Sequence, residues 1–163
     1  FGQLELIETQ TPSEVSSVTF SNIKENEYNV HFLTGVIADS STGTAGRGNK
    51  IQFFENGVLE SGSVYQYAIQ FGKTTGTFSE YIIASSNTNQ SVCFYMYFYN
   101  LGDSTKYSFS SSHSSFLYAG TNDETFMFGS GVLSQASTVD GIRIKTNANT
   151  FSGTLSLYGI RYS

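Results

Sequence analysis

The residues that could carry out nucleophilic or acid–base chemistry are few. The chain has two histidines, and a Ser-His-Asp triad would have to combine His113 with a serine and with Asp103 or Asp123. Nothing around these residues resembles a nucleophile elbow or another strained turn. Glycoside hydrolysis needs two carboxylates at about 5–9 Å, and Asp123-Glu124 is the only adjacent acidic pair. We therefore predict that the protein is not an enzyme.

Metal and cofactor sites have little support in the sequence. A calcium site could draw on Asp39, Asp103, Asp123 or Asp140, but these aspartates stand in no calcium-loop pattern. Aspartate is also common in turns, because its side chain bonds to nearby backbone. The single Cys93 excludes an internal disulfide and a cysteine-based metal site. We predict no cofactor and assign no metal ligand.

The strongest functional signal is the stretch VCFYMYFY, residues 92–99. Read as a strand, its even-numbered residues form an ordinary core face. The residues that point the other way are Cys93, Tyr95, Tyr97 and Tyr99. A face that met only water would carry Ser, Thr or Lys, whereas tyrosine suits contact with a protein or a sugar. The alternative is a tyrosine ladder that only stiffens an exposed sheet.

His31 is the fourth candidate contact residue. It alternates with Val30 and Phe32, which the period-two pattern places on one face toward the core. We therefore expect His31 to face away from the core, where a lone strand histidine is far more often a surface or interface residue than a catalyst. The predicted contact face for a subunit or ligand consists of Tyr95, Tyr97, Tyr99 and His31.

The composition indicates the kind of fold that must position these residues. The chain of 163 residues has 14 Phe, 11 Tyr, one Pro and no Trp, and only 13% of it is charged, about half the usual share. About ten segments with period-two patterning are separated by clusters of Gly, Ser and Asn. We predict a single domain over 1–163 that is all-β, an antiparallel β-sandwich and, within that class, a jelly roll.

Several local features follow from the same pattern. We expect Ile51 and Phe53 on a core face, followed by a turn at Asn56-Gly57. The stretch Asp39–Gly48 has little to bury and is predicted to be a mobile loop. We assign no strand to the serine-rich stretch that follows Tyr99.

The last segment, TFSGTLSLYGIRYS, is predicted to be a strand tied into a sheet. Leu155 and Leu157 share one face, and Ile160 would join them only if Gly159 sat in a bulge. We expect this strand to pair with Val139–Thr146 across a short hairpin loop and to close one of the two sheets.

The charge balance excludes some partners. The chain has 13 acidic against 8 basic residues, a net charge of −5, and no cluster of Lys or Arg. Because nucleic acid binding needs a basic surface, we expect no nucleic acid partner. The longest apolar run, residues 92–99, is too short to span a bilayer as a helix, so we expect no membrane partner.

The two ends of the chain carry a family resemblance. GIRIK, a short loop and TFSGTLSLYGI resemble the C-terminal hairpin of a diffuse family of bacteriophage virion proteins, in which a GIR-x-F strand and an SGT-x-SLYG strand end a jelly-roll-like module. LELIETQT, VTFSNI and YNVHFL are similar to the start of the same modules. The resemblance implies a structural protein of a tail, fibre or capsid decoration, and it carries over no functional residue.

Together these observations predict a non-enzymatic phage structural protein located in the virion. Its expected partners are other virion proteins and further copies of itself. A capsid decoration or cement protein is the first interpretation, because the chain forms one domain without a helical stalk. The second is the receptor-binding head of a tail or fibre, which could contact a host surface glycan. The third is a carbohydrate-binding module of a secreted protein, against which the absence of Trp counts mildly.

Overall fold

The protein is an all-β sandwich. Its computed structural model describes residues 2–39, 48–69, 78–84, 91–117, 124–146 and 149–161. Within these ranges the chain forms twelve strands and no helix, and thus no helix that could cross a membrane. All strand pairings are antiparallel. The predicted antiparallel β-sandwich is confirmed.

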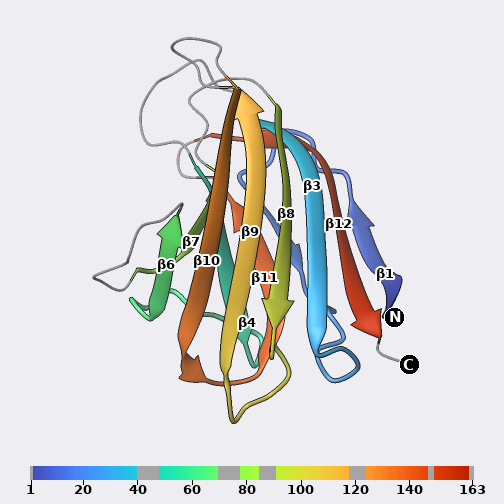
Figure 1. The fold of residues 1–163 in the computed structure, drawn as a ribbon, viewed down its shortest axis with the longest axis vertical. Helices are drawn as coiled ribbons and strands as arrows, with labels where there is room; N and C mark the ends of the chain where they lie inside the picture. Colours follow the sequence, from blue (N-terminus) through green and yellow to red (C-terminus); the bar gives the residue numbers. More distant parts are fainter. Residues whose placement is uncertain are drawn as a thin grey trace.

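Two sheets form the sandwich (Figure 1). The seven-stranded sheet has, in spatial order, β1 (Gln3–Gln10), β12 (Phe151–Arg161), β3 (Val30–Asp39), β8 (Ser91–Tyr99), β9 (Tyr107–Leu117), β10 (Glu124–Ala136) and β6 (Tyr65–Ile69). The second sheet has β2 (Ser17–Phe20), β11 (Val139–Lys145), β4 (Asn49–Glu55) and β5 (Val58–Leu59), and β7 (Tyr81–Ala84) also pairs with β4. Figure 1 shows β4 and β11 behind the seven-stranded sheet.

The path of the chain is that of a jelly roll. Strands β1 to β4 alternate between the two sheets, as do β7 and β8 and then β11 and β12. This gives the strand orders β1-β12-β3-β8 in one sheet and β2-β11-β4-β7 in the other, the paired layers of a double Greek key. Strands β9, β10 and β6 extend the first sheet beyond this unit.

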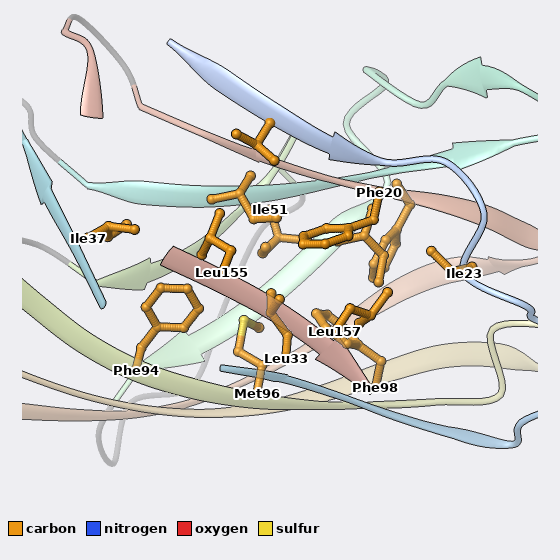
Figure 2. Close-up of a cluster of buried hydrophobic side chains, with 14 of the residues drawn as sticks. Phe20, Ile23, Leu33, Ile37, Ile51, Phe94, Met96, Phe98, Leu155 and Leu157 are labelled. Atoms are coloured by element: carbon orange, nitrogen blue, oxygen red, sulfur yellow. The ribbon is translucent and has the colours of Figure 1, made fainter. Parts of the chain in front are cut away.

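Period-two burial produces the core between the sheets. The even-numbered residues of β8 are buried as predicted, and Phe98 is fully buried. Ile51 and Phe53 of β4 are fully buried on the facing sheet. Figure 2 shows Phe94, Met96 and Phe98 packed with the leucines of β3 and β12. The turn after β4 is also as predicted, because Asn56 and Gly57 both have positive φ, 52° and 74°.

Strand β9 was not expected from the sequence. Its inward positions carry the serines 108, 110, 112 and 114, which no periodicity rule assigns to a core. Large side chains follow further along the same row: Ser110 is in register with Gly131 of β10, and Gly131 with Tyr67 of β6. Tyr67 and Ile69 of β6 are partly buried and pack against the core. A tertiary contact therefore supplies the apolar volume that β9 lacks.

The predicted C-terminal hairpin is wrong. Strand β12 pairs with β1 and β3, whereas β11 pairs with β2 and β4 in the opposite sheet. The connection between them crosses the end of the sandwich, which a short polar loop permits as readily as a hairpin. Strand β12 therefore has a partner on each side and does not close a sheet edge.

Gly159 does not form a bulge either. The register between β12 and β3 runs unbroken through Ile160 opposite Val30, so Ile160 lies on the face away from the leucines. The irregularity lies in β1, between Leu6 and Glu8. Gly159 is needed for another reason, because a Cβ there would lie 2.3 Å from the ring of Tyr28. Of the predicted loop Asp39–Gly48, residues 40–47 lie outside the described residues.

Candidate contact surface on the seven-stranded sheet

The candidate residues lie on the side of the seven-stranded sheet that turns away from the second sheet, which we call the outer face. Paired residues of antiparallel strands share a face. Tyr95 of β8 is opposite Thr34 of β3 and His113 of β9, and His113 is opposite Phe128 of β10. Two residues further along these strands, Phe32 of β3 is opposite both Tyr97 of β8 and Tyr158 of β12. The register thus aligns aromatic side chains across the sheet.

These rings contact one another in a continuous series, which we call the ring series. It runs across β12, β3, β8, β9 and β10 through Tyr158, Phe32, Tyr97, Tyr95, His113, Phe128 and Phe126. The centroids of successive rings are 4.5–6.2 Å apart, the separation at which aromatic pairs attract. The ring series is therefore a preformed surface with little freedom to lose on binding.

Most of the exposed apolar surface is on the outer face. Of the eleven large hydrophobic side chains exposed among the described residues, nine lie there: Leu4, Leu6, Val36, Tyr95, Tyr99, Tyr107, Phe109, Phe126 and Phe128. They are 37–59% exposed, and a large side chain contributes about 150–250 Å². The outer face therefore presents on the order of 800 Å² of these side chains, above the roughly 300–600 Å² of the largest patch on a typical monomer.

Carboxylates and bases are nearly absent from this surface. Among the described residues that the seven strands register to the outer face, the one carboxylate residue is Glu124, at the first position of β10 and on the parity of Phe126, and none is Lys or Arg. The ion pairs lie elsewhere, as in Glu80 with Lys50 and Lys145, or Glu5 with Arg161. Away from the first position of β10, recognition by this face must therefore use shape, apolar area and neutral hydrogen bonds.

Two shallow hollows interrupt the outer face. The first, of about 280 Å³, lies beside the ring series and is lined by Thr34, Gly35, Val36, Cys93, Phe94, Tyr95, His113, Ser114 and Ser115. The second, of about 200 Å³, is lined by Gln66, Tyr67, Ala68, Phe109, Ser110, Ser130, Gly131 and Val132. Both form where small side chains leave the sheet backbone uncovered between taller neighbours.

His113 is part of the ring series and does not meet Asp103. Its ring stacks on Phe128 at 4.5 Å and meets Tyr95 edge-on, with Nδ1 3.2 Å from the Tyr95 hydroxyl. Asp103 instead accepts hydrogen bonds from Thr105, and its pairing with Lys106 is the main reason that its pKa is lowered to about 2. Asp123 lies outside the described residues.

The expected surface position of His31 is wrong. Its side chain is fully buried, because Leu33 and Ile37 set the inward side of β3 and His31 shares their parity. Nε2 lies 2.8 Å from the carbonyl oxygen of Ile23, while Nδ1 is buried without a hydrogen-bond partner in the described structure. Burial lowers the pKa of His31. Phe32 takes the outward position instead, 4.9 Å from Tyr97.

The three predicted tyrosines do lie on the outer face. Tyr95 and Tyr99 are exposed and Tyr97 is half-buried beneath its neighbours. The sequence analysis missed the contributions of Phe32, His113 and Phe128. The outward position of Phe128 could have been predicted from the sequence. Met127 and Leu133 share the inward parity of β10, which leaves Phe128 on the outward parity.

The aspartates considered for calcium serve separate parts of the fold. Asp39 is buried at the end of β3, and Asp140 accepts a 2.7 Å hydrogen bond from the backbone N–H of Gly57. In the described part of the chain, no three His, Cys, Asp or Glu side chains are placed to hold a metal ion.

One pair of carboxylates that the sequence did not indicate is Glu55 and Glu60. Burial and the neighbouring Glu60 raise the pKa of Glu55, whereas the backbone N–H of Gly62 is the main cause that lowers the pKa of Glu60. Gln135 Nε2 donates to both carboxylates. Through that amide, the two carboxylates are tied to β10, which carries Gln135.

No family model and no curated protein matches the sequence. Among solved structures, a fructofuranosidase from Schwanniomyces occidentalis complexed with fructose is similar at a TM-score of 0.37 and 6% identity, covering 98% of this chain. The chain spans 34% of the length of that enzyme.

Two further solved structures show a comparably slight likeness. The marine PL-14 alginate lyase from Aplysia kurodai has a TM-score of 0.34 and 10% identity, with 82% of this chain and 70% of the lyase covered. The CBM2 module of the evolved Dit protein of Lactobacillus casei BL23 phage J-1 has a TM-score of 0.24 and 9% identity, with 90% and 69% covered. Likeness at this level identifies neither an activity nor a ligand for this chain.

Proposed function

We propose that the protein is a non-enzymatic structural and adhesion protein of a bacteriophage particle, and that it works by contact through its outer face. The observation that carries the contact function is the ring series, set in on the order of 800 Å² of exposed large apolar side chains. The resemblance of both chain ends to virion modules supports placing that contact in a phage particle.

The form of the exposed surface favours a protein neighbour over a sugar. Leu4, Leu6 and Val36 extend the patch beyond the rings, and each is about half exposed. Aliphatic side chains offer nothing to hydroxyl groups but bury well against another protein. Capsid decoration therefore remains the first interpretation, with attachment to neighbouring subunits as its mechanism.

Glycan binding is the second candidate, and the larger hollow is the observation that favours it. Hydroxyl groups of Thr34 and Ser115 line this hollow beside the ring of Tyr95. A sugar ring could stack on the aromatic wall and bond to the hydroxyls, as a receptor-binding head or a carbohydrate-binding module would require.

Attachment to particles tests the proposal. Purified protein is added to phage particles that lack it, and bound protein is measured after sedimentation. We expect Val36→Lys to abolish attachment, because it places a charge on the half-exposed centre of the outer face. Val58→Lys is the matched control, since Val58 is 69% exposed on β5 of the other sheet. Equal occupancy by both variants would contradict a contact role for this face.

A further inference from the structure

We infer that the partner of the outer face is a second copy of the chain, packed against it sheet to sheet. This inference rests on the proposed function, because it names the partner of the same surface. Three properties of the outer face carry it: its area, its charge and its relief.

The area matches that of a stable dimer. A standard interface buries about 800 Å² on each partner, and the exposed large side chains of the outer face present on the order of 800 Å². The patch runs from Leu6 on β1 to Phe126 on β10, which are 58% and 59% exposed. These strands are five positions apart in the sheet, so the patch is about 24 Å wide at a strand spacing of about 4.8 Å. A sugar in one hollow would leave most of this width in water.

The charge distribution favours a like-charged partner. Each copy carries a net charge of −5, so two copies repel unless their contact surfaces are free of carboxylates. The described part of the outer face nearly meets that condition, because its register includes one carboxylate residue, Glu124 at the first position of β10. Glu5 pairs with Arg161 at the β1 edge, and Glu80 pairs with Lys50 and Lys145 of the second sheet. A basic partner would instead be recognised by several acidic side chains, which the described part of this face lacks.

The relief of the outer face is suited to packing against itself. Sheets stack about 10 Å apart with their side chains interdigitated, as the two sheets of this domain already do. The raised rings of Tyr95, His113 and Phe128 lie directly beside the hollow of about 280 Å³. In a two-fold pair, both copies present the same ridge and hollow, so each ridge can enter the hollow of the other copy.

Sedimentation equilibrium across about 1–200 μM protein tests the inference directly. We expect wild type to dimerise, and Val36→Lys to weaken the dimer at least thirtyfold, because the substitution places an unpaired charge in the contact, at the edge of the hollow that Val36 lines. Val58→Lys should dimerise like wild type. Melting curves of dilute protein, where all three are monomeric, should coincide, because both positions are exposed.

The reactivity of Cys93 provides a second test that does not require a charged side chain to be introduced. This residue is the single cysteine, it is exposed, and it lines the larger hollow. A dimer that covers the outer face should slow its reaction with a thiol reagent as the protein concentration rises. Phe128→Ser should restore fast labelling at high concentration, because it removes a ring that fills the partner's hollow. Labelling that is independent of concentration would overturn the face-to-face dimer.

The outcomes separate this inference from the proposed function. If wild type is monomeric at 200 μM, the inference that the partner is a second copy is wrong. Loss of particle attachment in Val36→Lys would still support the contact role of the outer face. A monomer that binds an immobilised neutral glycan, and loses that binding in Val36→Lys, assigns the face to a sugar instead. A dimer that Val36→Lys and Val58→Lys weaken equally places the interface elsewhere.

Discussion

The two faces of the seven-stranded sheet differ in what covers them more than in their side chains. On β8, the inward Phe94, Met96 and Phe98 are almost completely buried by the second sheet, and the outward Tyr95 and Tyr99 stay about 40% exposed. Both faces are rich in rings that contact across strands. The difference shows that an apolar face on a strand does not by itself identify the core, because a sandwich covers only one side of each sheet.

The largest expected effect on the free energy of unfolding comes from removing an aromatic ring from the inner face of the seven-stranded sheet. Phe98→Ala should lower the free energy of unfolding by about 3–5 kcal/mol, since the side chain is fully buried and packs edge-on against Phe53 at 5.8 Å. Tyr99→Ala, one residue along and on the outer face, should cost less than about 1 kcal/mol. Urea denaturation measures both. Similar losses would remove the distinction between the two faces.

A smaller effect is expected where the inner face depends on the absence of a side chain. Gly159→Ala places a Cβ within 2.3 Å of the Tyr28 ring, which must shift and disturb its hydrogen bond to Glu5 and the cation–π contact with Arg161. We expect a loss of about 1–3 kcal/mol. Thr154→Ala, exposed on the same strand, is the control and should be nearly neutral. Thermal melting compares the two variants.

The comparison of the two faces extends to the pH dependence of stability, because His31 lies on the inner face and His113 on the outer face. Burial lowers the pKa of His31 below 6.5, so the unfolded chain takes up a proton near pH 6.5 that the folded protein does not. Stability from this group is complete above pH 6.5 and falls by about 1.4 kcal/mol per pH unit below it, until the folded pKa is reached.

The measurement is urea denaturation between pH 7 and pH 5 for wild type and His31→Gln, which should lack this loss. His113→Gln is the control, because it replaces the histidine of the outer face and leaves His31 in place. If wild type and His31→Gln follow the same pH dependence, the buried His31 does not set the acid sensitivity of the fold.

The smallest effect is expected at the rim of the outer face. Phe126→Ser removes a ring that is 59% exposed at the end of the ring series, so the free energy of unfolding should change by no more than about 0.5 kcal/mol. Differential scanning calorimetry at low concentration provides the check. A loss above about 2 kcal/mol would show that another part of the chain covers this ring.

The sequence alone determined much of the strand pattern and its parity. The alternation of β8, the inward Ile51 and Phe53 and the turn at Asn56-Gly57 all followed from local rules, because side chains alternate at every residue of a strand and a tight turn needs positive φ. The outward position of Tyr95, Tyr97 and Tyr99 followed in the same way. Such features can be predicted from the residues next to them in the sequence.

Only the tertiary structure decided the features that depend on distant parts of the chain. Strand β9 carries serines inward while Tyr67 of β6, two strands away, packs against the core, and β12 pairs with β1 and β3 because the chain crosses between sheets. His31 is buried because β3 lies with its Leu33 side against the second sheet. The ring series likewise joins five strands whose register no local pattern specifies. Alternation assigns a residue to one of two faces, but the layer that packs against the sheet determines which face becomes the core.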